Sequence, residues 1–179
     1  FSKTFGTKTG AWGSVTLSES NPTAVGAVKP KASRSGDIFI VFRQRTDSDN
    51  SGVIDNFDFF SLFVRRFDSA SQAWVAPELL ETDESNSVGS NFVVEVDDLG
   101  NAVVLFSRTV ASISSIFGNF FDRATGTWTG VQFLDNSDFD SVFSLTAPVC
   151  YGPKHFAFAF RQRTNSNAPF GATPGPKNK

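Results

Sequence analysis

Phe121-Asp-Arg-Ala-Thr-Gly-Thr-Trp128 is one of three versions of the same eight-residue stretch in this chain. The other versions are Phe67-Asp-Ser-Ala-Ser-Gln-Ala-Trp74 and Phe5-Gly-Thr-Lys-Thr-Gly-Ala-Trp12. All 3 Trp residues of the chain lie in them. The small polar residues between Phe and Trp are typical of a turn that joins two aromatic strands. We therefore interpret the stretch as the marker of a repeated β-hairpin.

The segments around the hairpins also follow one order. An apolar strand that follows a turn recurs at residues 38–42, 102–106 and 156–160. Each unit thus contains four short strands, which we name A to D in chain order. Strand A precedes the turn, B is the apolar strand, C ends at the repeated Phe, and D begins at the repeated Trp. Because the run 38–42 is apolar throughout, we expect it to be a central strand buried on both faces.

Four antiparallel strands in about 54 residues, the spacing from Trp74 to Trp128, have the size of a β-propeller blade. The sequence therefore predicts an all-β, β-propeller-like repeat domain over residues 1–164. Its predicted parts are a half blade at 1–17, blades at 24–83 and 88–135, and a half blade at 143–164, followed by a flexible tail at 165–179. A β-sandwich with coincidental Trp spacing is the alternative.

Two whole and two half blades add up to three, whereas propellers usually have about four to eight. Either further blades lie on other sequence, or two chains pair as three plus three blades, or the units form an open array. Exposed edge strands favour association. We therefore expect the main partner to be the chain itself, as a homo-oligomer or a filament.

The composition indicates a folded chain and argues against nucleic acid as a partner. Hydrophobic residues make up 40% of the 179 residues, and the 21 Phe favour strands. The net charge of −2 leaves no basic surface for nucleic acid. No apolar run approaches the roughly 20 residues that span a bilayer, so membrane insertion is not expected. The absence of Met suggests a mature secreted product or a piece of a longer protein, and we expect an extracellular or cell-surface location.

Two phrases carry a family resemblance. Phe121-Asp-Arg-Ala-Thr-Gly-Thr-Trp128 and Asp98-Leu-Gly-Asn-Ala-Val103 resemble the repeats of secreted bacterial β-propeller proteins, which are distantly similar to sialidase-like and integrin-type propellers. Arg123 and Thr125 stand where the sialidase Asp-box has Asp and Gly. The resemblance implies a propeller architecture and does not bring one activity with it.

The loop Asp47-Ser-Asp-Asn-Ser-Gly-Val-Ile-Asp-Asn-Phe-Asp58 places oxygen-bearing side chains at alternate positions. Ca²⁺ takes six to eight oxygen ligands from a tightly curled loop, with Gly where the chain turns sharply. The spacing fits an EF-hand loop and equally the Asp-x-Asp-x-Ser-Gly-x-x-Asp loop of integrin-type propellers. The predicted ligands are Asp47, Asp49, Ser51, the Val53 carbonyl, Asp55 and Asp58. An acidic solvated loop, in which Asp and Asn only make turns, is the alternative.

Arginines follow the B strands and form the second candidate site, namely Arg43, Arg45, Arg108, Arg161 and Arg163. In a propeller, equivalent positions converge, and clustered guanidiniums bind carboxylate or sulfate well. Salt bridging between blades, or simple solvation of the strand ends, explains the same pattern.

Catalytic patterns are weak. His155 is the single His and has no nucleophile motif around it. Cys150, the single Cys, lies in an apolar run and is expected to be a buried, unreactive thiol. Carboxylate pairs that could in principle hydrolyse glycosides are Glu78 with Glu81, Glu95 with Asp97, and Asp138 with Asp140.

These patterns favour a non-enzymatic, calcium-stabilised propeller module for adhesion, glycan binding or self-assembly into a surface structure. A fragment of a sialidase-like glycoside hydrolase, with its catalytic groups on other blades, is the second hypothesis.

Overall fold

The fold is all-β, as the sequence predicts. The computed structural model describes residues 5–6, 11–12, 25–48, 51–55, 58–81, 87–110, 113–135 and 142–162. Within these ranges every regular element is a strand, and every pair of neighbouring strands is antiparallel. The predicted tail at 165–179 and most of the predicted half blade at 1–17 lie outside the described residues.

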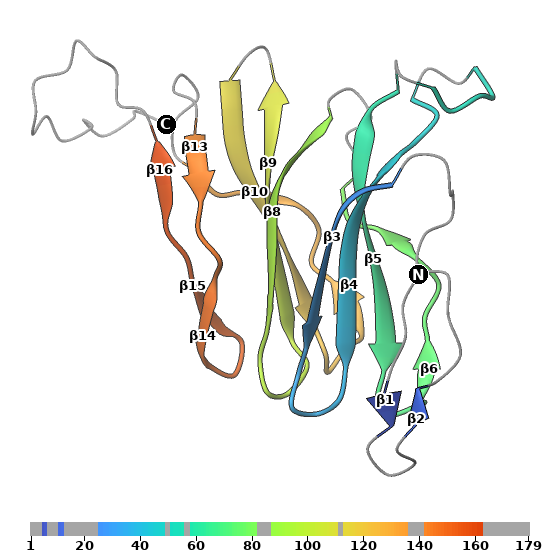
Figure 1. The fold of residues 1–179 in the computed structure, drawn as a ribbon. Helices are drawn as coiled ribbons and strands as arrows, with labels where there is room; N and C mark the ends of the chain where they lie inside the picture. Colours follow the sequence, from blue (N-terminus) through green and yellow to red (C-terminus); the bar gives the residue numbers. More distant parts are fainter. Residues whose placement is uncertain are drawn as a thin grey trace, which may run out of the picture.

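Two five-stranded sheets have the same internal order (Figure 1). The first sheet runs β3 (Val25–Ala32), β4 (Ile38–Arg45), β5 (Phe60–Asp68) and β6 (Ala73–Trp74), with β7 (Glu78–Leu79) also on β5. The second sheet runs β8 (Val88–Val96), β9 (Ala102–Val110), β10 (Ile113–Asp122) and β11 (Thr127–Trp128), with β12 (Gln132–Phe133) also on β10. In both sheets the B strand, β4 or β9, pairs with A on one edge and C on the other.

A third unit consists of two short strand pairs that follow one another along the same two segments (Figure 1). The pairs are β13 (Val142–Leu145) with β16 (Phe160–Gln162), and β14 (Val149–Gly152) with β15 (His155–Ala157). They correspond to strands A and B. At the other end of the chain, β1 (Phe5–Gly6) pairs with β2 (Ala11–Trp12).

The three repeated stretches are hairpins in one register. Trp lies directly opposite Phe in the pairs Phe5 with Trp12, Phe67 with Trp74, and Phe121 with Trp128. The ring centroids are 5.5 Å apart in the second hairpin and 5.3 Å apart in the third. The predicted Phe-to-Trp hairpins are therefore confirmed at all three places.

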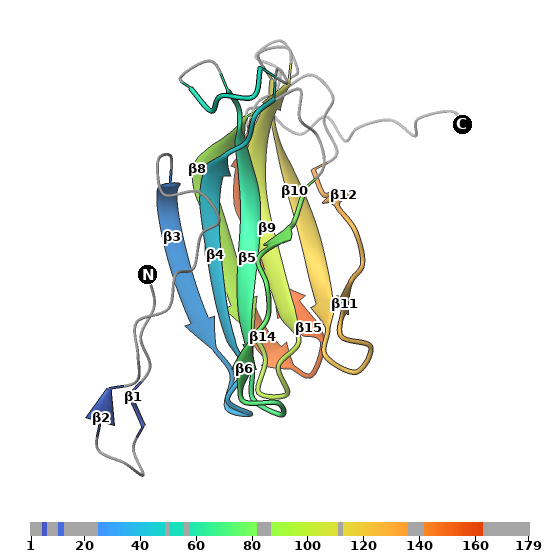
Figure 2. The same ribbon diagram turned by 90° about the vertical axis from the view of Figure 1, so that its right-hand side faces the viewer.

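The sheets stack face to face, and the second sheet lies between the first sheet and the third unit (Figures 1 and 2). Strand β9 contributes Val104 and Phe106 to the core shared with the first sheet, where they join Phe39 and Leu62. Its alternate residue Leu105 joins the core shared with the third unit. Residues 39–42 of the run 38–42 are buried on both faces, as expected, with exposed fractions of 6% or less, and Ile38 is half-buried.

Three predicted strands are interrupted. Each D strand, expected to continue from Trp, is divided into two short strands, β6 and β7 in the first sheet and β11 and β12 in the second. Pro77 lies in the first gap, and Pro has no N–H to donate to a neighbouring strand. Gly130, at φ 91°, turns the chain in the second gap. The predicted A strand from Phe143 to Cys150 is likewise split into β13 and β14, with Pro148 in the break.

The last turn residue before the second strand of the hairpin has a left-handed backbone in both sheets. We therefore expect substitutions at this position to have opposite effects on stability in the two hairpins. Gln72 adopts φ 55° and its counterpart Gly126 adopts φ 71°. A left-handed backbone costs a residue with a Cβ roughly 1 kcal/mol, whereas Gly adopts it freely. We expect Gln72→Gly to raise the free energy of unfolding by about 0.5 kcal/mol. Relief of the left-handed backbone provides the gain, and loss of the bond from Gln72 Nε2 to the Ser69 carbonyl reduces it.

Gly126→Gln is the matched control and should lower the free energy of unfolding by about 1 kcal/mol. A Cβ at Gly126 would meet no atom within 4 Å, so the backbone alone sets this cost. Urea unfolding followed by Trp fluorescence measures both effects. Shifts of the same sign in the two variants would contradict the explanation.

Candidate functional site

The two predicted sites adjoin each other at one end of the first sheet. The loop between β4 and β5 contains the predicted calcium ligands, and Arg45 belongs to the predicted arginine set. The Arg45 Nη1 donates to the carbonyls of Asp55 at 3.1 Å and Asp58 at 2.7 Å. The arginine thus closes the loop that the sequence assigns to a metal ion.

The carboxylates of the loop bind backbone N–H groups. Asp47 accepts from Ser51 at 2.9 Å and from Gly52 at 2.8 Å, and Gly52 adopts φ 79°. Asp58 is buried and accepts from the N–H groups of Ser48 and Asp55, both at 2.8 Å. These bonds fold the loop as the acidic-turn alternative describes.

The oxygens of Asp47, Ser51 and Val53 lie within one turn of the loop, since the Ser51 hydroxyl donates to the Val53 carbonyl at 3.0 Å. Asp49 lies outside the described residues. Among the residues the structure does describe, no group of three or more His, Cys, Asp or Glu is placed to hold a metal ion. Calcium binding by this loop remains a prediction from the sequence.

The arginines of the second predicted site do not converge on one place in the structure. Arg43 and Arg45 both lie over the Phe60 ring, at 4.1 Å and 4.5 Å from its centroid. Burial, with a smaller contribution from the Arg45 charge, lowers the pKa of Arg43. Arg161 is exposed in the third unit, across the second sheet, and Arg163 lies outside the described residues.

Arg108 fits the salt-bridging explanation. Its guanidinium lies 4.3 Å from the Phe117 ring centroid and 3.4 Å from Glu81 Oε2. Glu81 follows β7 of the first sheet, whereas Arg108 belongs to β9 of the second. This pair therefore links two sheets.

A buried carboxylate that none of the sequence patterns singled out links the same two sheets. Asp37 has no exposed surface. Its Oδ1 accepts the Ser69 N–H at 2.9 Å, and its Oδ2 accepts from Arg123 Nε at 2.8 Å. Arg123 also donates from Nη2 to Asp68 Oδ1 at 2.9 Å. A single arginine of the second sheet thus holds two acids of the first.

Part of this arrangement recurs one unit later, with the cation at a different place in its unit. Asn101 stands where Asp37 does in the first sheet, and its Oδ1 accepts the Arg123 N–H at 3.0 Å. Asp122 corresponds to Asp68 and accepts from Lys154 Nζ of the third unit at 2.7 Å. The acid after the repeated Phe therefore receives a cation from the following unit at both interfaces. The recurrence of Asp at this position was the available sequence signal.

These contacts shift the pKa of three acids. The hydrogen bond from Lys154 holds the pKa of Asp122 below its usual value. The Ser71 hydroxyl, more than the nearby arginines, lowers the pKa of Asp68. Burial raises the pKa of Asp97, but hydrogen bonds from Lys154 N, Asn101 and Leu99 outweigh burial and lower it. All three acids are thus held as carboxylates.

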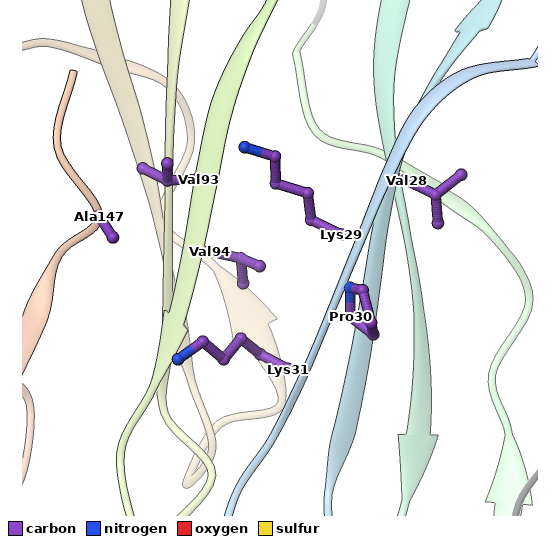
Figure 3. A pocket seen from close by; sticks show the side chains of 7 residues that line it. All are labelled: Val28, Lys29, Pro30, Lys31, Val93, Val94 and Ala147. Carbon is purple, nitrogen blue, oxygen red and sulfur yellow. The ribbon is translucent and has the colours of Figure 1, made fainter. Parts of the chain in front are cut away.

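A groove of about 310 Å³ runs along the A strands (Figure 3). It is lined by Val28, Lys29, Pro30 and Lys31 of β3, Val93 and Val94 of β8, and Ala147 between β13 and β14. The Lys31 ammonium pairs with Glu95 Oε2 at 2.8 Å, and the Lys29 ammonium lies 5.3 Å from the Phe92 ring centroid. The groove is therefore mostly apolar, with two ammonium groups at its walls.

Apart from Glu78, which is exposed, the described groups considered for catalysis take part in structural contacts. Glu81 pairs with Arg108, Glu95 with Lys31, and Asp97 with Asn101 at 2.7 Å. His155 is exposed, with Nδ1 2.7 Å from the Pro153 carbonyl. Cys150 is half-buried, where full burial was expected, and its thiol lies 3.2 Å from the Gly152 carbonyl. Asp138 and Asp140 lie outside the described residues.

Neither a protein-family model nor a curated protein matches this chain. In the part of the chain that the structure describes, no helix has the length and apolar character to cross a membrane.

The link from Arg123 to Asp37 should stabilise the fold. Removing one member of a buried ion pair leaves the other charge poorly compensated. We expect Arg123→Met to lower the free energy of unfolding by about 2 kcal/mol, because Asp37 then retains the Ser69 N–H, a long bond from the Ser35 hydroxyl and the more distant Arg66. Lys154→Met is the matched control and should have a clearly smaller effect, since Lys154 and Asp122 are more exposed. Equal losses in urea unfolding would contradict this account.

The calcium prediction can be separated from the loop's own hydrogen bonds. Saturating Ca²⁺ at 100 times Kd would stabilise the fold by about 2.7 kcal/mol, so the wild-type melting temperature should be higher in calcium than in chelator. Asp49→Ala should remove this difference. Asp47→Ala should lower the melting temperature even in chelator, since Asp47 accepts two backbone N–H groups. Identical wild-type melting with and without calcium would remove the metal from the account.

Proposed function

We propose that this chain is an extracellular, non-enzymatic module of β-propeller type. Adhesion, glycan binding and self-assembly into a surface structure are the roles open to such a module. Self-assembly has the strongest support, because the contacts between neighbouring units repeat.

The observation that carries this proposal is the recurrence of the inter-unit ion pair. Arg123 reaches back to Asp68, and Lys154 reaches back to Asp122. The first and second units therefore each offer an acid to the unit that follows. A unit that packs on both faces through such contacts is suited to a stack or ring of many units.

The way the units follow one another supports the propeller arrangement that we propose. Each complete sheet is a meander in chain order, and the A strands β3 and β8 of consecutive sheets are neighbours (Figure 1). In a propeller, the first strands of the blades surround a central axis. The groove beside β3 and β8 would then lie near that axis, where Lys29 and Lys31 could meet an anionic group of a glycan.

The mass of the native particle tests the proposal. We expect light scattering at micromolar concentration to give a multiple of the 19.4 kDa chain mass. A finite multiple indicates a closed ring, and a mass that grows with concentration indicates a filament. The measurement should be repeated in chelator to detect a contribution of calcium. A monomer at all concentrations would rule out self-assembly as the role.

A further inference from the structure

We propose that Arg43 and Arg45 of β4, which share the ring of Phe60, bind the carboxylate or sulfate group of an acidic glycan. The site lies at the end of the first sheet, where β4 leads into the loop 46–59. This proposal rests on the glycan-binding role within the proposed function, and it names the site and the class of ligand.

The two guanidiniums lie beside each other. Arg43 and Arg45 are two positions apart on one strand, so their side chains leave the same face of the sheet. Their Cζ atoms lie 4.1 Å and 4.5 Å from the Phe60 ring centroid. Burial lowers the pKa of Arg43, and the like charge of Arg45 lowers it further. The site therefore places two positive charges next to each other.

Arg43 lacks a counter-charge. Among the residues that the structure describes, Arg43 has no ion-pair partner and donates no hydrogen bond. Its Nε is buried without an acceptor. A charge that is taken out of water without a partner destabilises the fold. A bound anion would accept hydrogen bonds from this guanidinium and compensate its charge.

The Arg43 side chain is held in place but remains accessible. Its Nε would lie 3.2 Å from a Cβ at Gly26 of β3, so Gly at that position leaves room for the guanidinium. Arg43, Arg45 and Phe60 are each only half-buried, and Nε is the only nitrogen of Arg43 that is buried without a partner. The Nη1 and Nη2 groups therefore reach the surface, where a ligand can meet them.

Arg45 is oriented by the loop that follows it. Its Nη1 donates to the carbonyls of Asp55 at 3.1 Å and Asp58 at 2.7 Å. These acceptors are uncharged main-chain groups, so the two bonds fix Arg45 without neutralising it. The Asp58 carboxylate itself accepts the N–H groups of Ser48 and Asp55. Arg45 is thus positioned before a ligand arrives, which lowers the entropy lost on binding.

The second sheet forms without this cluster. Small hydroxyl residues occupy the equivalent positions there, namely Ser107 for Arg43, Thr109 for Arg45 and Ser114 for Phe60. The Thr109 and Ser114 hydroxyls are 2.7 Å apart, within hydrogen-bond distance. A sheet with the same strand order is therefore built with small polar groups at these positions, and packing alone does not explain two arginines and a ring in the first sheet.

Carboxylate and sulfate groups match this arrangement. The planar N–H donors of a guanidinium bind such oxygens in pairs, through short, charge-assisted hydrogen bonds. Phe60 lies against both arginines and stabilises them by cation–π contact, so it supports the cations rather than stacking on a sugar ring. The site should therefore select the acidic group of a uronic acid or a sulfated sugar, and neutral glycans should not bind.

Arg43→Met tests the site, because Met keeps an unbranched apolar stem over Phe60 and removes the charge. Calorimetry on the full chain measures binding to heparin, which carries sulfate, and to polygalacturonate, which carries carboxylate, with dextran as the neutral polymer. We expect the wild type to bind at least one acidic polymer and Arg43→Met to bind it about tenfold more weakly or less. Arg34→Met is the matched control, since it removes an exposed arginine at the other end of the sheet and should keep the wild-type affinity.

The melting temperature without ligand separates a binding role from a structural one. Arg43→Met removes a charge that has no partner, so it should melt no more than about 3 °C below the wild type. Sodium sulfate at constant ionic strength should raise the melting temperature of the wild type and of Arg34→Met more than that of Arg43→Met. An Arg43→Met chain that fails to fold, or melts far lower, would show that Arg43 maintains the fold and would overturn the proposal.

The remaining outcomes distinguish this proposal from self-assembly. Wild-type protein that binds neither acidic polymer, or equal weakening in Arg43→Met and Arg34→Met, would overturn the glycan site. A lower particle mass of Arg43→Met by light scattering would show that a second copy supplies the acidic group, which overturns the glycan site while self-assembly stands. Polymer binding that depends on Arg43 in a monomeric protein would support the site although self-assembly fails.

Discussion

The buried carboxylate of Asp37 is the constraint on which the stacking of the first two sheets depends. A charge without water contact requires partners, and these come from both sheets, as the Ser69 N–H and the Arg123 guanidinium. A Cβ at Gly100 would collide with Asp37 Oδ2, so the turn of the second sheet must carry Gly there. One carboxylate thus fixes a turn, a hairpin and an arginine that are distant in sequence.

Burial of the apolar faces holds the sheets together, and the ion pair between Asp37 and Arg123 fixes their relative orientation. Strand β9 buries Val104 against the first sheet and Leu105 against the third unit, so a sheet in this position has no polar face. Burial of apolar area is not directional and would allow the sheets to slide or rotate. Contacts at the turns, from Arg123 to Asp68 and from Lys154 to Asp122, select one arrangement.

Local patterns explain what the sequence could predict. The hairpin register follows from a short turn between Phe and Trp, and the buried B strands follow from continuous apolar runs, so both were accessible without a structure. The role of Asp37 was not, since its partner Arg123 is 86 residues away and an Asp after a turn resembles any solvated turn residue. The loop from Asp47 to Asp58 shows the same ambiguity, because carboxylates that can bind calcium can equally accept the N–H groups of their own loop.

The first hairpin has the Phe and Trp of the other two hairpins but lacks their charged residues. Gly6 stands where Asp68 and Asp122 stand in the other hairpins, and Ser69 of the following sheet stands where Arg123 does. The acid and the cation are therefore absent together, so the first hairpin can meet the first sheet without an unpaired charge. A contact without a buried ion pair avoids the cost of desolvating two charges.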